Sequence, residues 1–472
     1  MAERLELHPD RLFPPEGRAL EIARELHAAV VDLPILSPHG HTDPRWFADN
    51  EPFTDPTSTL LTPDHYLVRM LYSQGVPMES LGVRALDGST PPVDPRAAWR
   101  IFAERFHLFW GTPSGIWLDH VFAEVFGLEH RLSADTADQT FDQISARLAE
   151  PAFRPRALLD RFGIEVIATT DTPIDDLGHH QRLADEGYAG RVIPTFRPDV
   201  VVDPDHDDFG SSIRTLGELT GRDITDWGDY LAALFDRRKL AISLGATASD
   251  HGPPTARTAA IDDVTARRLL QRAVDGSIEP DEAELFRGRI LIEMARMSTQ
   301  DGLVMQLHAG ARRNHNRQVH QRFGRDVGGD MAGPVEYVES LRDLLDEFGN
   351  DTRFRIVLFT LDETTFSREL APLAGHYPSV FLGPPWWFLD TVDAMMRFRR
   401  AVTDTAGFAN TTGFVDDTRA FFSIPARHDV ARRVDCRYLA ELVAEHRLTI
   451  DQAHRVAVDL VIGRTRHVFN LS

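Results

Sequence analysis

The feature that most constrains the fold is the alternation of short apolar runs with longer stretches of helical periodicity. Eight runs rich in aliphatic, β-branched or aromatic residues end in polar residues: 31–36, 165–170, 191–196, 240–244, 303–308, 355–360, 380–382 and 412–416. This alternation predicts an α/β fold, a distorted eight-stranded parallel (β/α)8 barrel of the TIM type surrounded by helices. A doubly wound open sheet is the competing architecture, but no Gly-x-Gly-x-x-Gly follows the first predicted strand.

The uneven spacing of the predicted strands indicates helical insertions. Residues 1–43 should hold an amino-terminal helix and the first strand. Residues 44–160 are far longer than a barrel connection needs, so they predict a helical subdomain that covers the mouth of the barrel. Residues 161–472 should form the remainder of the barrel, with a second helical insertion at about 253–302.

Composition narrows the class of protein. A chain of 472 residues with 42% hydrophobic content can bury a large core. The formal net charge of −21 argues against nucleic acid or an anionic membrane as a partner, because phosphates need a basic surface. The sequence shows neither a signal peptide nor an apolar run of membrane-spanning length, so we expect a cytoplasmic protein. A small-molecule substrate is expected, and a homo-oligomer stays open.

Lysine usage excludes several mechanisms. Lys239 is the only lysine, so a Schiff base or a lysine-bridged pair of metal ions would have to use it. It directly precedes the predicted strand at 240–244 and would lie at that strand's entrance, whereas catalytic groups of such barrels lie at the exits. We therefore predict a solvated structural lysine.

Two histidines and a distant aspartate form the candidate metal site. His39 and His41 follow the first predicted strand, where residues two apart share a face and can reach one cation. Asp417 follows the last predicted strand, and two imidazoles with one carboxylate are a common zinc set with an open position. Two alternatives stay open: the His-x-His pair is a surface accident, or Asp417 caps a helix.

Other strand ends carry further candidates. Arg197 follows the third predicted strand and His308 ends the fifth. His308 either touches the metal or its water, or is a core histidine, and Arg197 is otherwise a surface arginine. Trp386 and Trp387 are either core residues or a surface on which a sugar could stack.

Together the strand ends and loops resemble the uronate isomerases, the non-hydrolytic branch of the amidohydrolase superfamily. The resemblance runs through most of the chain, and the strings that carry it are His39-Gly40-His41, Asp64-His65-Tyr66, Thr169-Thr170-Asp171, Phe196-Arg197-Pro198-Asp199, Ser249-Asp250-His251-Gly252, Met305-Gln306-Leu307-His308, Arg313-Asn314-His315-Asn316, Trp386-Trp387-Phe388 and Asp417-Thr418-Arg419 with Arg427-His428. Their order and spacing together are far more specific than any one of them.

The resemblance implies aldose–ketose isomerisation of hexuronates, D-glucuronate to D-fructuronate and D-galacturonate to D-tagaturonate. It implies a divalent metal, with zinc the expected ion, held by His39, His41 and Asp417, and a substrate lined by His65, Tyr66, Arg197 and Arg419. His308 and Trp386 are further candidates for contact with the substrate. The reaction needs groups that move protons, for which Tyr66 and Asp417 are the candidates; which of the two removes the C2 proton stays open. Arginines suit a substrate carboxylate because a planar guanidinium binds it through two parallel hydrogen bonds.

Three departures from the family pattern leave the preferred uronate open: Ser37, Pro384-Pro385 and His315. The competing function is a metal-dependent hydrolase, such as a deaminase or lactonase, that uses the same residues. A second alternative is a catalytically inert sugar-acid binding protein. The intact set of His39, His41 and Asp417 argues against it, because a pure binder needs no open metal site.

Overall fold

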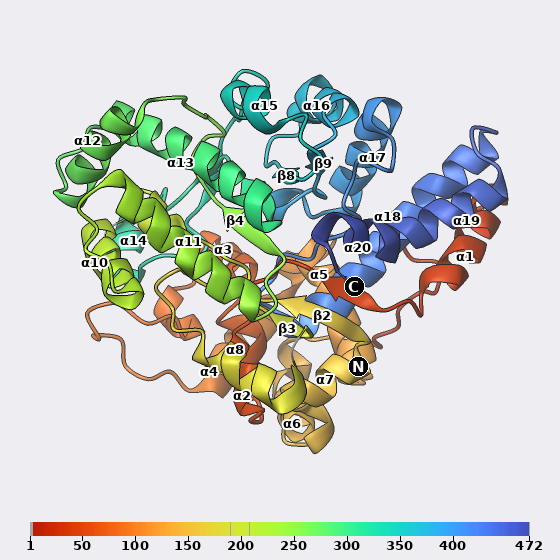
Figure 1. Ribbon diagram of the computed structural model, residues 1–472. Coiled ribbons are helices and arrows are strands. Elements are labelled where there is room, and N and C mark those ends of the chain that lie inside the picture. Colours follow the sequence, from red (N-terminus) through yellow and green to blue (C-terminus); the bar gives the residue numbers. More distant parts are fainter. Residues whose placement is uncertain (1–2, 189, 207, 472) are drawn as a thin grey trace.

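Parallel strands form the centre of the fold. The protein is described by a computed structural model that covers residues 3–188, 190–206 and 208–471 (Figure 1). One sheet has the order β1–β2–β3 and another the order β4–β5–β8–β9, and every pair within them is parallel. Their bounds are Ile35–Ser37 (β1), Ile164–Ala168 (β2), Val192–Ile193 (β3), Ala248–His251 (β4), Val304–His308 (β5), Ile356–Phe359 (β8) and Val380–Leu382 (β9). The predicted α/β fold with parallel sheets is confirmed.

Hydrogen bonds link the two sheets and extend beyond them. Phe196, just after β3, pairs in parallel with Asp171 on one side and with Ser249 of β4 on the other. Leu382 of β9 pairs in the same way with Thr411. The backbone N–H of His41 donates to the carbonyl of Thr418 at 3.0 Å, so the segment that follows Thr411 returns to the end of β1. The carboxyl ends of these strands therefore meet in one region.

The predicted strand at 240–244 is wrong. Residues 240–243 belong to α11 (Trp227–Ser243) and Leu244 is its C-cap; the buried side chains of this helix include Tyr230, Ala233, Leu234, Arg237 and Ala241. This spacing is that of one helix face, and the apolar residues of 240–244 continue it. The fourth strand is instead β4, which is short and largely polar.

The last predicted strand, 412–416, forms no regular strand. Gly413 has a φ of 77°, which takes the backbone out of the extended conformation, and only Thr411 makes a bridge to β9. The segment still runs beside the end of β1, so Asp417 lies near His39 and His41, as predicted from the sequence.

Between β1 and β2 the chain is helical and contains no strand, and the structure describes all of this segment. The helices are α2 (Pro44–Asp49), α3 (His65–Ser73), α4 (Pro95–Glu104), α5 (Pro113–His120), α6 (Ala137–Leu148) and α7 (Pro155–Arg161), with short 3₁₀ or π turns η1 (Thr57–Leu61), η2 (Met78–Leu81), η3 (Phe106–Phe109), η4 (Val121–Val125), η5 (Ala134–Thr136) and η6 (Pro151–Phe153).

The remaining helices surround the strands (Figure 1). They are α1 (Arg18–Val30), α8 (Gly178–Leu183), α9 (Asp199–Val202), α10 (Phe209–Thr220), α12 (Asp263–Val274), α13 (Pro280–Asp301), α14 (Arg317–Phe323), α15 (Arg342–Phe348), α16 (Ala371–His376), α17 (Val392–Ala406), α18 (Ile424–Ala444), α19 (Ile450–Val458) and α20 (Arg464–Phe469), with turns η7 (Ala184–Tyr188), η8 (Phe366–Leu370), η9 (Trp387–Leu389), η10 (Phe421–Ser423) and η11 (Asp459–Gly463). The antiparallel pair β6 (Ala311–Arg312) and β7 (Met331–Ala332) brackets α14. Among the described residues, no helix combines the length and the apolar character needed to cross a bilayer.

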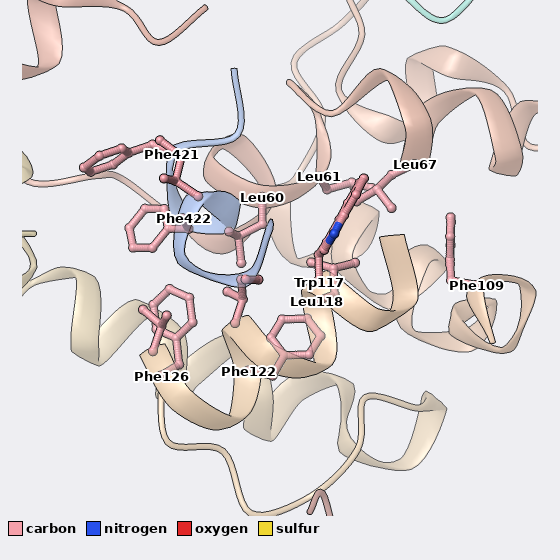
Figure 2. Packing of buried hydrophobic residues seen from close by; sticks show 14 of the residues in the cluster. Leu60, Leu61, Leu67, Phe109, Trp117, Leu118, Phe122, Phe126, Phe421 and Phe422 are labelled. Atoms are coloured by element: carbon pink, nitrogen blue, oxygen red, sulfur yellow. The ribbon is translucent and has the colours of Figure 1, made fainter. Parts of the chain in front are cut away.

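An aromatic core anchors the segment that follows Asp417. In Figure 2, Phe421 and Phe422 of η10 enter the apolar cluster formed by the helices between β1 and β2. The ring of Phe422 stacks on Phe126 with centroids 5.3 Å apart and meets Phe53 edge-on at 5.0 Å. Burial of two phenylalanines here stabilises the approach of this segment by several kcal/mol, of the order of 2 kcal/mol for each ring. The helical segment therefore supports the site as well as flanking it.

Candidate active site

A pocket of about 340 Å³ lies at the carboxyl ends of the strands. All the site residues predicted from the sequence line it: His39, His41, His65, Tyr66, Arg197, His308, Trp386, Asp417 and Arg419. They come from segments that are up to 380 positions apart in the chain, a separation that follows from residues 39 and 419. The fold therefore brings residues that are distant in the sequence together in one pocket.

The two histidines and Asp417 converge on one point. Oδ1 of Asp417 lies 2.9 Å from Nε2 of His41 and 3.3 Å from Nε2 of His39. Burial alone would raise the pKa of Asp417, but the charge of His39 and the hydrogen bonds from both imidazoles hold it well below its usual value. Two imidazole nitrogens and a carboxylate oxygen within 4.8 Å of one another fit a divalent cation. Asp417 does not cap a helix, since the next turn begins at Phe421 after Ala420.

The backbone around the pocket is strained. Asp417 has a φ of 40°, in the left-handed region that costs a non-glycine residue of the order of 1–3 kcal/mol. Asn314, Asp326 and Trp387 also have positive φ values and also line the pocket. Such strain persists only where the surrounding structure holds it, and here it gathers at the site.

A second buried group adjoins the first and was not assigned from the sequence. Oδ1 of Asp250 lies 2.6 Å from Nδ1 of His308, and its Oδ2 lies 3.0 Å from Nη1 of Arg197 and 4.0 Å from Nε2 of His39. Burial raises the pKa of Asp250, but Arg197, His308 and His39 outweigh it and hold the pKa well below the usual value. Asp250 is therefore an ionised residue that orients both His308 and Arg197. Its position at a strand end was the available signal.

His308 faces the first cluster. Its ring lies 4.9 Å from that of His39 and 4.0 Å from that of Phe359, and its Nε2 lies 3.8 Å from Oδ2 of Asp417. That nitrogen is buried and has no hydrogen-bond partner among the residues that the structure describes. Trp386 meets the same ring edge-on at 4.7 Å, so this tryptophan is both a core residue and part of the pocket wall.

His65 and Tyr66 begin α3, and Asp64 holds them there. The carboxylate of Asp64 accepts hydrogen bonds from the backbone N–H of Tyr66 at 2.8 Å and of Leu67 at 3.3 Å, as a helix cap does. Burial raises the pKa of the Tyr66 phenol far above its usual value, although Arg427 opposes this. Burial, assisted by Arg419, lowers the pKa of His65 to about 3. At neutral pH the phenol is therefore protonated and His65 is uncharged.

Five arginines line the pocket, and four of them, Arg197, Arg313, Arg419 and Arg427, form different ion pairs. Arg197 forms two close ion pairs, with Asp199 at 2.9 Å through Nε and with Asp250 at 3.0 Å through Nη1. Arg419 has only a loose pairing with Asp326 at 3.6 Å. The sequence reasoning gave no role to the other two, although both lie in the strings that carry the resemblance. Arg427 pairs with Asp390 at 2.5 Å and lies 3.6 Å above the ring of Trp117, and Arg313 pairs with Asp330 at 3.1 Å.

Parallel strands whose carboxyl ends carry a His/Asp cluster define an α/β enzyme with a candidate metal centre. A family model described as glucuronate isomerase matches residues 19–469, so the chain belongs to this family. Uronate isomerase from Xanthomonas euvesicatoria pv. vesicatoria (strain 85-10) is 56% identical over 467 residues, which cover 99% of each chain. The enzyme is thus an isomerase that acts on uronates.

Solved structures agree with this assignment. The crystal structure of glucuronate isomerase from Caulobacter crescentus is 54% identical, with a TM-score of 0.98, and the match covers 100% of this chain and 98% of that one. Uronate isomerase from Thermotoga maritima has a TM-score of 0.91 at 27% identity, and the match covers 98% and 99% of the two chains.

Proposed function

We propose that the enzyme interconverts the aldose and ketose forms of hexuronates, D-glucuronate with D-fructuronate and D-galacturonate with D-tagaturonate. The observation that carries the proposal is the convergence of His39, His41 and Asp417 in the same pocket as Tyr66 and Arg419. Membership of the glucuronate isomerase family supports it. The competing hydrolase function has no comparable support.

In this proposal His39, His41 and Asp417 hold one divalent cation, zinc. A bound cation would polarise the carbonyl and hydroxyl oxygens of the substrate. The donor set of two imidazoles and one carboxylate suits zinc. Arg197 lies at hydrogen-bonding distance from Asp250 and already supplies the positive charge there, which favours one metal over two.

In this proposal Asp417 and Tyr66 transfer the protons of the isomerisation. The isomerisation moves one hydrogen from C2 to C1 and one from the C2 hydroxyl to the C1 oxygen, through an enediol. Asp417 is ionised and can accept the C2 proton, whereas the phenol of Tyr66 is protonated and can donate. Each such group contributes roughly a hundredfold to ten-thousandfold to the rate.

The substrate's carboxylate is assigned to Arg419 and Arg197. Arg419 is the better candidate for direct contact, because its pairing with Asp326 at 3.6 Å leaves donors available. Arg197 adds positive charge while it orients Asp250. His65, His308 and Trp386 would line the sugar.

We also propose that the strands and the segment 412–416 close into one distorted (β/α)8 barrel. The chain of hydrogen-bonded neighbours from β1 through Phe196 to Thr411, and the contact of His41 with Thr418, support closure. Residues 1–43 would supply the first strand, 44–160 a helical insertion over the mouth, and 161–472 the rest, with a second insertion at about 253–302. A cytoplasmic location and the absence of nucleic-acid and membrane partners stay predictions, and light scattering would measure whether the enzyme is a homo-oligomer.

One experiment tests the reaction, the metal and the mechanism together. The purified enzyme is assayed with both uronates and with a panel of amides and lactones, and its metal content is measured in the same sample. We expect ketose formation from a uronate, near one metal per chain, and deuterium at C1 of the product in deuterated water. Partial incorporation fits a shielded base. Full retention of the substrate hydrogen with two metals per site would refute the proton-transfer mechanism, and hydrolysis without isomerisation would refute the proposed reaction.

A further inference from the structure

The turn that carries both histidines is held by a side chain to which no role has been given. The hydroxyl of Thr170 donates a hydrogen bond to the carbonyl oxygen of Gly40 at 2.7 Å. Gly40 is the residue between His39 and His41, so its peptide sets the directions of both imidazoles. Thr170 is half-buried and lines the same pocket.

The backbone of Thr170 is rigid, which makes its hydroxyl a fixed point. The residues on either side of it pair with the neighbouring strand segment: the N–H of Thr169 donates to Ile193 at 2.9 Å, and the N–H of Asp171 donates to Thr195 at 3.0 Å. The side chains of Thr169 and Asp171 contact each other at 2.6 Å. Because side chains alternate along extended backbone, Thr170 points to the opposite side, toward the turn.

Two other contacts hold the turn at His39–His41, and neither of them involves the carbonyl oxygen of Gly40 that Thr170 binds. The N–H of His41 donates to Thr418 at 3.0 Å, which fixes the far side of the turn. A Cβ on Gly40 would lie 3.2 Å from the carbonyl oxygen of Ala168 and 3.5 Å from that of Thr418, so the turn is packed closely between the ends of two neighbouring segments. Among the described residues, Thr170 makes the one side-chain hydrogen bond recorded to the backbone of this turn.

We propose that Thr170 is a positioning residue whose hydroxyl holds the Gly40 peptide, and so orients both His39 and His41 for a divalent cation. The inference rests on the proposed function, because it takes these two histidines and Asp417 as the metal ligands. Groups that orient a metal ligand typically change metal affinity roughly 10- to 100-fold when they are removed.

The test is zinc affinity, measured by competition between the metal-free enzyme and a chromophoric chelator. Thr170→Val keeps the volume and removes the hydroxyl, and we expect zinc affinity to fall at least roughly tenfold. Thr170→Ser restores the hydroxyl and should bring affinity back close to that of the parent. With saturating zinc, the variant should regain more of its kcat than at limiting zinc.

Thr258→Val is the matched control. The hydroxyl of Thr258 also donates to a distant backbone carbonyl, that of Ser340 at 2.6 Å, but Thr258 does not line the pocket. This variant should lose a similar amount of thermal stability and keep the parent's zinc affinity.

The outcomes separate the inference from the proposed function. If the parent binds zinc and His41→Asn does not, the ligand set stands; equal affinity in the parent and Thr170→Val then overturns the role of Thr170. Equal weakening in the Val and Ser variants also overturns it, because packing rather than the hydroxyl would be responsible. If the parent itself binds no zinc, the proposed metal site fails. Should Thr170→Val not fold, Thr170→Ala and Thr170→Ser differ by one oxygen and repeat the comparison.

Discussion

Asp417 combines a strained backbone with two imidazole contacts. Its φ of 40° is unfavourable for most residues, but asparagine and aspartate tolerate this region better than others do. Asparagine can therefore keep the backbone while it removes the negative charge. This makes the residue testable without loss of the fold.

We expect Asp417→Asn to abolish turnover and to retain the parent's circular dichroism spectrum. The amide neither accepts the C2 proton nor balances the charge of a cation held by His39 and His41. Turnover and metal content are measured on the same purified sample. A variant that stays active with a full complement of metal would contradict both roles.

Arg419→Met and Arg197→Met should both lower kcat/KM, but in different ways. Loss of a buried carboxylate's charged partner costs about 3 kcal/mol, roughly a hundredfold in kcat/KM. Arg419 has a loose partner, so its substitution should act mainly on KM. Arg197→Met leaves Asp250 without its close cation and should also lower stability in urea. Arg353, which is 74% exposed, provides the control Arg353→Met. If both pocket variants behave as this control does, the carboxylate is bound elsewhere.

At the scale of elements, the start of α3 places two site residues through its cap. Asp64→Ala should cost about 1 kcal/mol of unfolding free energy and lower kcat, because His65 and Tyr66 occupy the first turn. Asp64→Asn keeps a side-chain oxygen that can accept the capping hydrogen bonds, so this variant should retain most of the parent's unfolding free energy and kcat. Asp94, which caps α4 through the N–H of Arg96 at 3.1 Å, provides the control. Asp94→Ala should lose similar stability in urea and keep kcat. An Asp64→Ala enzyme with unchanged kcat would mean that α3 is held by its packing alone.

The strands show which elements a sequence pattern can predict. Runs with a clear apolar character, such as those at 303–308 and 355–360, are strands in the structure. β4 was not predicted because Ser249, Asp250 and His251 are polar. All three are nevertheless buried in the structure, and Asp250 is paired with His308 and Arg197. Hydropathy cannot reveal a strand whose polar side chains are satisfied by partners distant in the chain.

The meeting of the candidate site residues in one pocket was predicted more accurately than the strands around them. His39, His41, Arg197, His308 and Asp417 could be predicted from their positions at strand ends, whereas His65, Tyr66 and Arg419 were predicted from the resemblance to the uronate isomerases. No role was predicted for Asp250 and Arg427, since their contacts with His308, Arg197, Asp390 and Trp117 arise only in the fold.

At the scale of the whole molecule, Asp429 of α18 joins distant segments. It pairs with Arg11 at 2.6 Å and Arg433 at 2.9 Å, and it lies 3.6 Å from His27 of α1 and 3.7 Å from His120 of α5. Burial raises its pKa, but the nearby imidazole of His27 and the charges of Arg11 and Arg433 outweigh burial and hold the pKa well below the usual value. Its contribution to stability is present above the unfolded-state pKa of about 3.9 and is lost as the pH falls toward the folded-state value.

Asp429→Asn should therefore lower the Tm strongly at pH 7, and the difference from the parent should shrink progressively as the pH falls below about 4 toward the lowered folded-state pKa, because the folded parent keeps its charge until then. Removing one partner from a buried ionic network costs about 3 kcal/mol. Scanning calorimetry across this pH range measures the difference. Asp160→Asn, which affects a 72% exposed partner of Arg191, is the control and should change little. A constant difference in Tm at every pH would show that the effect of Asp429 is steric rather than electrostatic.

The single lysine has a practical consequence for work with the intact enzyme. Lys239 lies on α11 with 59% of its side chain exposed, is paired with Asp236, and is absent from the pocket lining. An amine-reactive dye or resin can therefore attach only there or at the chain's amino terminus. Every molecule coupled through this side chain would be held in the same orientation, and the catalytic groups, which include no amine, would remain chemically unaltered.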